Sequence, residues 1–149
     1  MSDAQQLQTL LYREIPVSRA HGISVTRLSE HCIEISAPLA PNRNIHQTAF
    51  AGSIFTVATL AGWSMLNSHL WRHDIQADVV LSKSEIRYMR PVNRDFTATC
   101  TLPEADILEN FLSVLSSKKK SSISLVIRII CADKSCAKIN ADFVAVKKL

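Results

Sequence analysis

The strongest constraint on the fold of this chain is a stretch without charge from Asn44 to Trp71, flanked directly by Arg43 and Arg72. From Thr48 onward the stretch predicts one long helix that is apolar on nearly every side. Such a helix is either wrapped by the rest of a domain or inserted in lipid. Polar and small residues recur along the whole stretch, too many for a lone membrane span, so we expect a helix buried in protein.

The length and composition indicate one domain over residues 1–149. The chain has 149 residues, of which 47% are hydrophobic, so it can bury a substantial core. The N-terminus lacks a basic segment followed by an apolar one, so we expect no signal peptide. The cysteines show neither CxxC spacing nor a histidine in ligand register; they are Cys32, Cys100, Cys131 and Cys136. We therefore expect reduced thiols in a cytoplasmic protein, with no metal and no cofactor.

The formal net charge is +4 at pH 7. The basic residues of interest are Lys83, Arg87, Arg90, Arg94 and Lys118 to Lys120. No nucleic-acid reading motif accompanies them and no aromatic residues are interleaved, so we expect no nucleic-acid partner. Two interpretations stay open, an ordinary solvated surface and a docking patch for an acidic partner.

Two further helices are predicted outside the central stretch. Asp3 can cap an N-terminal helix whose leucines and Ile15 follow helical spacing, and Pro16 ends or bends it. Residues 104–120 are ambiguous. We expect a short helix over Ile107 to Leu115, followed by a basic loop.

Alternation of apolar and polar residues predicts six strands. They run over about Ile23–Leu28, Cys32–Ala37, Val79–Arg90, Phe96–Leu102, Ile123–Cys131 and Ala137–Val146. Asp133-Lys134-Ser135 is expected to be the turn of a hairpin between the last two. Strict alternation in the third strand places Leu81 on one face with Lys83, Glu85 and Arg87. The opposite face then carries Val80, Ser82, Ser84, Ile86 and Tyr88.

The predicted order is a helix, two strands, the long apolar helix and then four strands. One very hydrophobic helix among six antiparallel strands favours a strongly curved sheet wrapped around that helix. The predicted fold class is therefore α+β.

Three features of the chain carry a resemblance: Asn44 before the central helix, the small segment Ala51-Gly52-Ser53, and Ile86-Arg87-Tyr88-Met89-Arg90-Pro91 at the end of a strand. Together they resemble the hotdog fold of acyl-thioester enzymes. The segment APLAPNRNIHQTAFAGSIFTVATLAGW resembles more narrowly the YiiD C-terminal, thioesterase-like domain family, which includes stand-alone malonyl-acyl-carrier-protein (malonyl-ACP) decarboxylases.

The resemblance implies an assembly and a location for the active site. Hotdog subunits pair through their sheets, as a homodimer or a dimer of dimers, and the active site lies between two subunits at the N-terminus of the central helix. The strand from Val79 to Arg90 would then be the pairing edge, which also protects an otherwise exposed strand. Tyr88 would lie near the acyl tunnel.

The resemblance also allows a comparison with the common hydrolytic hotdog pattern. In that pattern an Asn precedes a His-Gly-Gly turn by six residues, and an acid follows the His by nine. Asn44 takes the Asn position, whereas Phe50 stands in place of the His and Thr59 in place of the acid. Phe50 and Thr59 are equally compatible with core residues without mechanistic meaning. The helix offers no base to activate water, and His46 in the loop is the nearest candidate.

Hydrogen-bond donors remain at the predicted helix entrance. Backbone N–H groups around Ala51, Gly52 and Ser53 would be unpaired at the positive end of the helix dipole. Asn44 can donate an amide N–H and Thr48 a hydroxyl. Such donors stabilise the enolate left when a malonyl thioester loses CO₂. An apolar wall around the carboxylate would help; its candidates are Phe50, Ile54 and Phe55.

Simpler roles remain open for the same residues. Asn44 can be a turn or cap residue, and Asn42 competes with it for any functional role. Thr48 can be the N-cap of the helix. His46 can be an ordinary histidine, because no carboxylate close in sequence orients it. Ser53 has no legible Ser-His-acid arrangement around it, so we do not expect a nucleophile there.

Three hypotheses follow. The first is an enzyme that decarboxylates malonyl-ACP to acetyl-ACP at the start of fatty acid synthesis, with acidic carrier protein as partner. The second is an acyl-CoA or acyl-ACP thioesterase, in which His46 and a water held by Asn44 carry out hydrolysis. The third is a non-catalytic acyl-thioester binding protein.

Overall fold

The computed structural model describes residues 1–148. The helices are α1 (Asp3–Glu14), α2 (Val17–Ala20), the 3-10 helix η1 (Ala40–Asn42), α3 (Ala51–Arg72) and α4 (Ala105–Lys118). The strands are β1 (Ser24–Leu28), β2 (Cys32–Ala37), β3 (Ala77–Tyr88), β4 (Phe96–Thr101), β5 (Lys120–Cys131) and β6 (Lys134–Lys147). All six predicted strands are present and in the predicted order.

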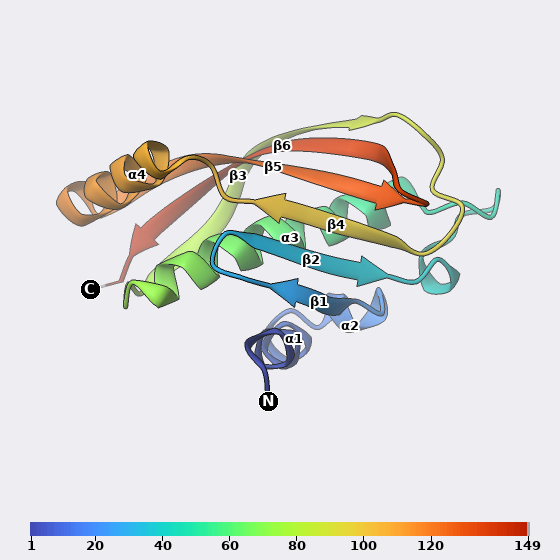
Figure 1. The fold of residues 1–149 in the computed structure, drawn as a ribbon, viewed down its shortest axis with the longest axis horizontal. Coiled ribbons are helices and arrows are strands. Elements are labelled where there is room, and N and C mark those ends of the chain that lie inside the picture. The colour runs from blue at the N-terminus through green and yellow to red at the C-terminus, as the bar shows by residue number, and fades with distance from the viewer. Residues whose placement is uncertain (149) are drawn as a thin grey trace.

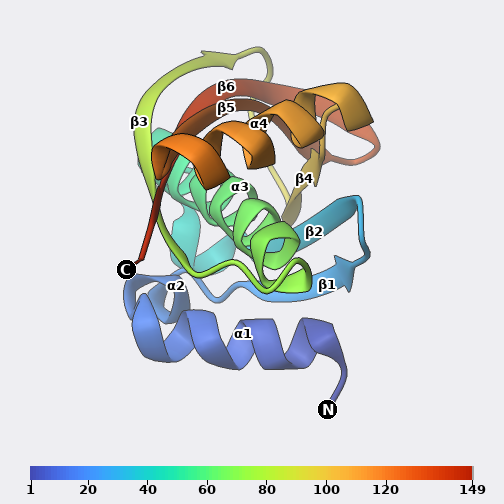
Figure 2. The same cartoon turned by 90° about the vertical axis from the view of Figure 1, so that its left-hand side faces the viewer.

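The six strands form one antiparallel sheet in the order β1-β2-β4-β5-β6-β3. The sheet curves around α3, which lies along its concave side, and α1 lies outside β1 (Figures 1 and 2). β1 and β3 are the two edge strands. The predicted architecture, a curved sheet wrapped around one long helix, is confirmed.

The central helix α3 is buried over most of its length. Fourteen of its 22 residues are buried, and they include polar ones such as Ser64 and Asn67. Gly62 allows the sheet to come close, because a β-carbon there would lie 2.8 Å from Cε2 of Phe143 on β6. Among residues 1–148, no helix has the length and apolar character needed to cross a membrane.

Two helix boundaries differ from the prediction. The N-cap of α1 is Ser2, which forms a capping box with Gln5, so Asp3 is the first helical residue and not the cap. α4 extends beyond the predicted Ile107–Leu115 segment because it continues to Lys118, where Lys119 ends it with a φ of 64°. The expected basic loop is therefore absent at this point, since β5 starts at Lys120.

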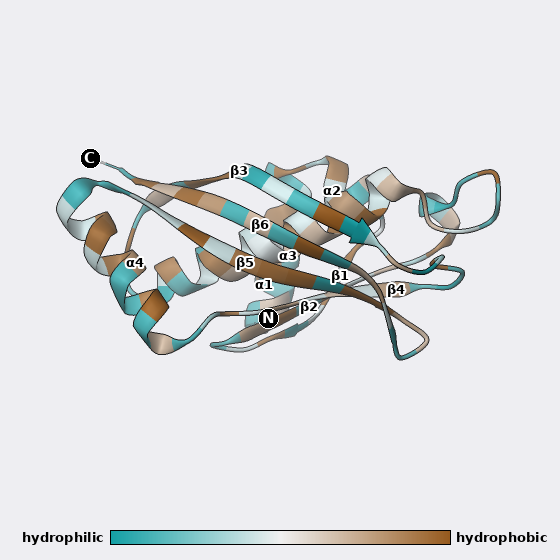
Figure 3. Cartoon of the chain, turned by 90° about the horizontal axis from the view of Figure 1, so that it is seen from above, coloured by the Kyte–Doolittle hydropathy of each residue, from teal (hydrophilic) through white to brown (hydrophobic). Residues whose placement is uncertain are grey.

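The predicted faces of β3 are wrong for its first half because the strand contains a bulge. Ser82 and Lys83 together oppose Asp142 of β6, and the Ser82 hydroxyl donates to the Asp142 carbonyl at 2.9 Å. The extra residue reverses the alternation, so Leu81 packs against the core together with Ile86. Lys83, Glu85 and Arg87 are exposed and stay on the outer face. Hydrophilic and hydrophobic residues alternate along β3, β5 and β6, as Figure 3 shows.

The β5–β6 hairpin turns one residue earlier than predicted. Its two turn residues, Ala132 and Asp133, have φ values of 50° and 63°, which is the backbone of a tight two-residue turn. Lys134 already belongs to β6 and pairs with Cys131. This turn lies at the same end of the molecule as the start of α3, whereas α4 lies at the opposite end (Figure 1).

Candidate active site

The loop between η1 and α3 closes on itself and is fixed to the rest of the domain. The backbone N–H of Asn44 donates to the carbonyl of Thr48 at 2.7 Å, and Arg43 and Ala49 form an isolated antiparallel bridge. The Ala49 N–H donates to the carbonyl of Val92, in the segment after β3, at 2.7 Å. We call residues 43–49 the entrance loop. It holds Asn44 and Thr48 next to the start of α3.

The side chain of Asn44 holds the entrance loop together and keeps donor capacity. Its Oδ1 accepts the backbone N–H groups of His46 at 2.8 Å and Thr48 at 3.2 Å. Its Nδ2 lies 3.0 Å from the hydroxyl of Thr48. An amide nitrogen carries two hydrogens, so one of them is left for a ligand. Asn44 is thus a turn residue, as the simpler interpretation had it, and also an available donor.

Thr48 is not the cap of the central helix. α3 begins at Ala51, three residues later, and the residue at its N-cap, Phe50, provides no side-chain hydrogen bond. The predicted start at Thr48 is wrong because the hydrogen bonds of Thr48 are made with Asn44. The helix therefore starts without a side-chain cap.

Three backbone N–H groups at the start of α3 lack an acceptor. The N–H of Phe50 donates to the Asn42 carbonyl at 2.7 Å, and the first helical bond runs from Ile54 to Phe50 at 3.1 Å. Between them, the N–H groups of Ala51, Gly52 and Ser53 meet no hydrogen-bond acceptor within residues 1–148. Ala51 and Gly52 are exposed, whereas Ser53 is buried. Donors at the positive end of a 22-residue helix have the chemistry that suits an anion or a developing oxyanion.

The ring of Phe50 covers one side of these donors. Its side chain is 56% exposed, so the interpretation of Phe50 as a core residue is wrong. The ring lies against Gly52, where a β-carbon would come within 2.7 Å of Cε2 of Phe50. Of the other candidates for an apolar wall, Ile54 is buried in the core, and Phe55 is half-buried.

An apolar groove of about 250 Å³ runs along the first half of α3. It is lined by Ile15, Val17, Phe55, Thr56, Thr59, Leu60 and Trp63. Thr59 is half-buried there, and its hydroxyl donates to the Phe55 carbonyl at 2.9 Å, within its own helix. No carboxylate takes part in this groove. Its apolar walls suit an acyl or pantetheine chain next to the helix entrance.

Tyr88, the last residue of β3, reaches the helix entrance. Its hydroxyl donates to the carbonyl of Ala51 at 3.0 Å. Burial raises the pKa of the Tyr88 hydroxyl above its ordinary value, so the group stays protonated at neutral pH. Tyr88 thus contacts the first residue of α3, and the Asn44–Thr48 pair lies in the loop that leads into the same helix.

Asn42 has no capacity left for a ligand. It is 1% exposed, and its Nδ2 donates to the carbonyls of His21 at 2.9 Å and Pro38 at 2.8 Å. Its Oδ1 lies 2.7 Å from Nδ1 of His21. Asn42 therefore fixes the chain before the entrance loop and does not compete with Asn44. Nothing in the local sequence pairs Asn42 with His21, twenty-one residues earlier.

His46 is exposed in the entrance loop, and no side-chain hydrogen bond or salt bridge joins it to another of the described residues. Only its backbone N–H takes part in the loop, through Asn44. A general base needs an orienting partner, and the structure of this chain does not bring one to His46. Within residues 1–148 no group of three or more His, Cys, Asp or Glu side chains could hold a metal ion.

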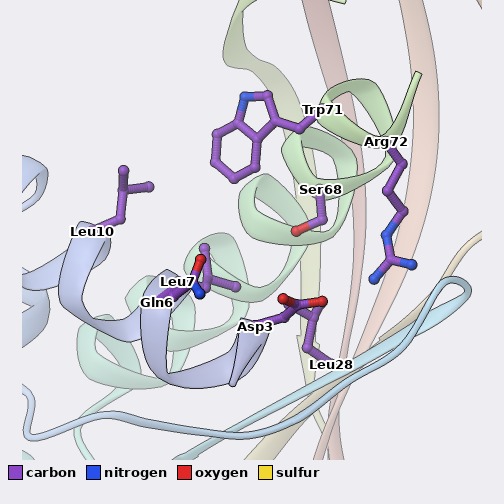
Figure 4. A pocket seen from close by; sticks show the side chains of 8 residues that line it. All are labelled: Asp3, Gln6, Leu7, Leu10, Leu28, Ser68, Trp71 and Arg72. Carbon is purple, nitrogen blue, oxygen red and sulfur yellow. The ribbon is translucent and has the colours of Figure 1, made fainter. Parts of the chain in front are cut away.

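A second hollow, of about 400 Å³, lies at the opposite end of α3 (Figure 4). It is lined by Asp3, Gln6, Leu7, Leu10, Leu28, Ser68, Trp71 and Arg72. Here the helix presents its C-terminal end, which favours positive charge and offers no free N–H group to an oxyanion. The hollow therefore does not share the chemistry of the entrance.

One known protein family matches almost the whole chain. Residues 4–147 match the model of the family described as "Putative thioesterase (yiiD_Cterm)". The chain belongs to this family. The predicted resemblance to the YiiD C-terminal domain family is confirmed.

Solved structures support the same assignment. A "putative thioesterase" from Shewanella oneidensis is 32% identical, with a TM-score of 0.87 and coverage of 96% of both chains. A protein of unknown function from Chlorobaculum tepidum is 27% identical, with a TM-score of 0.92 and coverage of 97% of this chain and 94% of that one. A mutant thioesterase from Pseudomonas aeruginosa shares the fold at 13% identity, with a TM-score of 0.76 and coverage of 99% and 96%. The fold is the hotdog fold of thioesterases.

Proposed function

We propose that this protein acts on acyl thioesters and that its reaction is the decarboxylation of malonyl-ACP to acetyl-ACP. The observation that carries the proposal is the composition of the helix entrance. The chain places unpaired N–H groups at Ala51, Gly52 and Ser53 a few residues after the Asn44–Thr48 pair, and none of the described carboxylates or histidines forms a hydrogen bond with these N–H groups. Such a site offers donors for an oxyanion but no oriented base for water.

The reaction needs little beyond these donors. When the bond between the α-carbon and the carboxylate breaks, CO₂ leaves. The electron pair of that bond stays with the α-carbon and delocalises onto the thioester oxygen as an enolate. N–H groups at Ala51 and Gly52 and the free amide hydrogen of Asn44 stabilise that oxygen, and each well-placed donor is typically worth about 3–4 kcal/mol of barrier. A proton then adds to the α-carbon, from water or from the Tyr88 hydroxyl, which lies at the helix entrance.

Phe50 and the apolar groove supply the remaining walls. An apolar ring beside a carboxylate destabilises the charged substrate relative to neutral CO₂. Phe50 is the exposed aromatic side chain next to the donors, and the groove beyond Phe55 accommodates an apolar chain.

We further propose that two copies pair through β3. β3 is an edge strand of the sheet, and its exposed apolar side chains include Val80 and Tyr88. An unpaired edge of twelve residues is long for an exposed strand, and pairing with a second copy would protect it. The partner would then cover Phe50 and close the site. The pairs form a homodimer or assemble further as a dimer of dimers.

Hydrolysis is the second candidate, and the family description as a thioesterase favours it. In this reaction His46 would activate a water that Asn44 holds against the thioester carbon. His46 lies two residues from Asn44 but carries no partner that orients its ring, which makes this mechanism the weaker one for this chain.

Product analysis distinguishes these reactions. The protein is incubated with malonyl-ACP and, separately, with acetyl-ACP and long-chain acyl-ACP and acyl-CoA. We expect acetyl-ACP and CO₂ from malonyl-ACP and little release of free thiol from the other substrates. Free thiol from several acyl chains with malonyl-ACP left intact would reject decarboxylation in favour of hydrolysis. No turnover of any substrate would indicate a binding protein.

A further inference from the structure

The outer face of the sheet carries a row of three cations in direct register. Arg87 of β3 is opposite Lys138 of β6, and Lys138 is opposite Arg128 of β5. We call these residues the cationic row. Like charges directly opposite each other on a sheet destabilise it, and none of the three forms a salt bridge within the described chain.

The neighbouring rows of residues on the same face do not place like charges opposite each other. In one, Lys83 is opposite Asp142, and Asp142 is opposite Ser124, whose hydroxyl donates to its Oδ1 at 2.5 Å. In the next, Glu85 is opposite Asn140. Charges are therefore balanced along the sheet until the end nearest the β5–β6 turn. The accumulation of positive charge is local and needs an explanation of its own.

A hollow adjoins the cationic row at that end. Its lining consists of Met89, Arg90, Arg128, Lys134 and Ser135, and it contains three cations and no carboxylate. We call it the cationic hollow. The hydroxyl of Ser135 is buried and finds no hydrogen-bond partner within residues 1–148. Neither Arg90 nor Lys134 forms a salt bridge with a described residue.

The backbone holds the cationic hollow in place. The N–H groups of Met89 and Arg90 both donate to the carbonyl of Cys136, at 2.8 and 3.1 Å. These bonds tie the segment after β3 to the start of β6, on either side of the hollow. The donors of the hollow are thus presented by two strand ends that are fixed to each other.

The cationic hollow lies close to the proposed active site. Arg90 is two residues beyond Tyr88, so their Cα atoms are at most about 7 Å apart. The Tyr88 hydroxyl contacts Ala51 at the start of α3. A ligand in the hollow could therefore extend around the end of β3 to the helix entrance.

We propose that the cationic hollow binds the phosphate group of the phosphopantetheine arm that carries the acyl thioester. The two guanidinium groups and the ammonium of the hollow match the several acceptor oxygens of a phosphate better than they match a single carboxylate. The inference rests on the proposed function, because it takes a phosphopantetheine thioester as substrate. Carrier protein and CoA both contain this phosphate.

The test compares binding of free 4′-phosphopantetheine and free pantetheine, which differ only in the phosphate, by calorimetry. We expect the phosphorylated compound to bind at least about tenfold more tightly at low salt, with the ratio shrinking as salt screens the charges. Equal affinities would overturn the proposal. Because neither compound carries an acyl group, a failure of the proposed reaction leaves this measurement unaffected.

Variants locate the effect. In Arg128→Gln the affinity ratio should fall about tenfold, towards one, and Arg128→Lys should restore part of it. Lys118→Gln is the control and should keep the wild-type ratio, because Lys118 is the last residue of α4, which lies at the opposite end of the molecule from the β5–β6 turn (Figure 1). An unchanged ratio in Arg128→Gln, with circular dichroism showing a folded protein, would contradict the location.

A third arm separates the sources of phosphate. CoA adds a nucleotide with further phosphates to the same arm. We expect phosphopantetheine, which lacks the nucleotide, to bind more tightly than pantetheine already. If only CoA binds more tightly than pantetheine, the hollow binds the nucleotide and the proposal is wrong. A preference for phosphopantetheine without turnover of malonyl-ACP would support the hollow and reject the reaction.

Discussion

The two ends of α3 differ in how they treat polar groups. At the N-terminal end, three backbone N–H groups lack acceptors and Gly52 and Phe50 are exposed. At the C-terminal end, His69 is 7% exposed, and both of its ring nitrogens are buried without a partner among the described residues. The first end leaves polar groups available for a ligand. The second encloses a polar group within the fold.

The enclosed histidine stands in a basic environment. Its ring lies 4.6 Å from that of His73, centroid to centroid, and the His69 carbonyl accepts a hydrogen bond from Nδ1 of His73 at 2.9 Å. Burial lowers the pKa of His69 below its ordinary value of 6.5, and the nearby charges of His73, His31 and Arg72 lower it further, against Glu30. One helix therefore leaves backbone N–H groups open to a ligand at one end and encloses a polar side chain at the other.

The largest expected effect tests the entrance. Asn44→Ala removes a side chain that both donates and holds the entrance loop, so we expect kcat for the proposed reaction to fall about 100-fold or more. Steady-state kinetics with malonyl-ACP measure the loss, and thermal unfolding checks that the fold is retained. Turnover close to that of the wild type would remove Asn44 from the site.

Asn42→Ala tests the difference between a polar side chain that is enclosed in the fold and one that is available to a ligand. Asn42 lies two residues from Asn44, but its side chain is buried and fully hydrogen-bonded. Its loss leaves the carbonyls of His21 and Pro38 without their donor, so the free energy of unfolding should fall by about 2 kcal/mol. Urea denaturation measures this. A stable variant that loses only turnover would mean that Asn42 acts on the substrate.

The buried end predicts a pH dependence of stability. Because the pKa of His69 is lower in the folded protein, the unfolded chain takes up the proton first as the pH falls. Stability should therefore decline below about pH 6.5, by at most about 1.4 kcal/mol per pH unit for this group, until folded His69 is also protonated. His69→Phe should reduce the slope of the free energy of unfolding against pH in this range. Urea denaturation at pH values from about 5 to about 8 measures that slope. An unchanged slope would show that other groups cause it.

The smallest effect is expected at Tyr88. Tyr88→Phe keeps the ring but removes the hydrogen bond to the Ala51 carbonyl, which is worth about 1 kcal/mol, so kcat/KM should fall about fivefold. Rate measurements in wild type and variant test this. A loss as large as that of Asn44→Ala would make Tyr88 the essential proton donor rather than a positioning residue.

The fold could largely be predicted from the sequence because it depends on long patterns. The uncharged stretch from Asn44 to Trp71 and the alternation in six strands together specify a helix that needs a sheet around it. Local irregularities of the strands are less predictable. One extra residue at Ser82–Lys83 reverses the faces of β3, and no signal in the alternation marks it.

The site could be predicted only in part. The resemblance to the hotdog fold points to Asn44, Thr48, Tyr88 and the start of α3, and their role in a reaction stays a prediction. In the structure Asn44 contacts Thr48, and Tyr88 contacts Ala51 at the start of α3. The true start of α3 at Ala51 was missed, because Thr48 has the chemistry of a cap but uses it within the entrance loop. The cationic hollow was also missed as a unit, since Arg90, Arg128 and Lys134 meet only through strand register and the position of the hairpin turn.

In the proposed reaction, the donors at the start of α3 stabilise an enolate. The most direct test is the reaction of malonyl-ACP in D₂O, followed by mass spectrometry of the carrier protein. We expect acetyl-ACP in which the bond newly formed at the α-carbon is a C–D bond with one deuterium from solvent, and CO₂ released in equal amount. Holo-ACP and intact malonate, without CO₂, would contradict it, because that outcome is hydrolysis and involves no enolate.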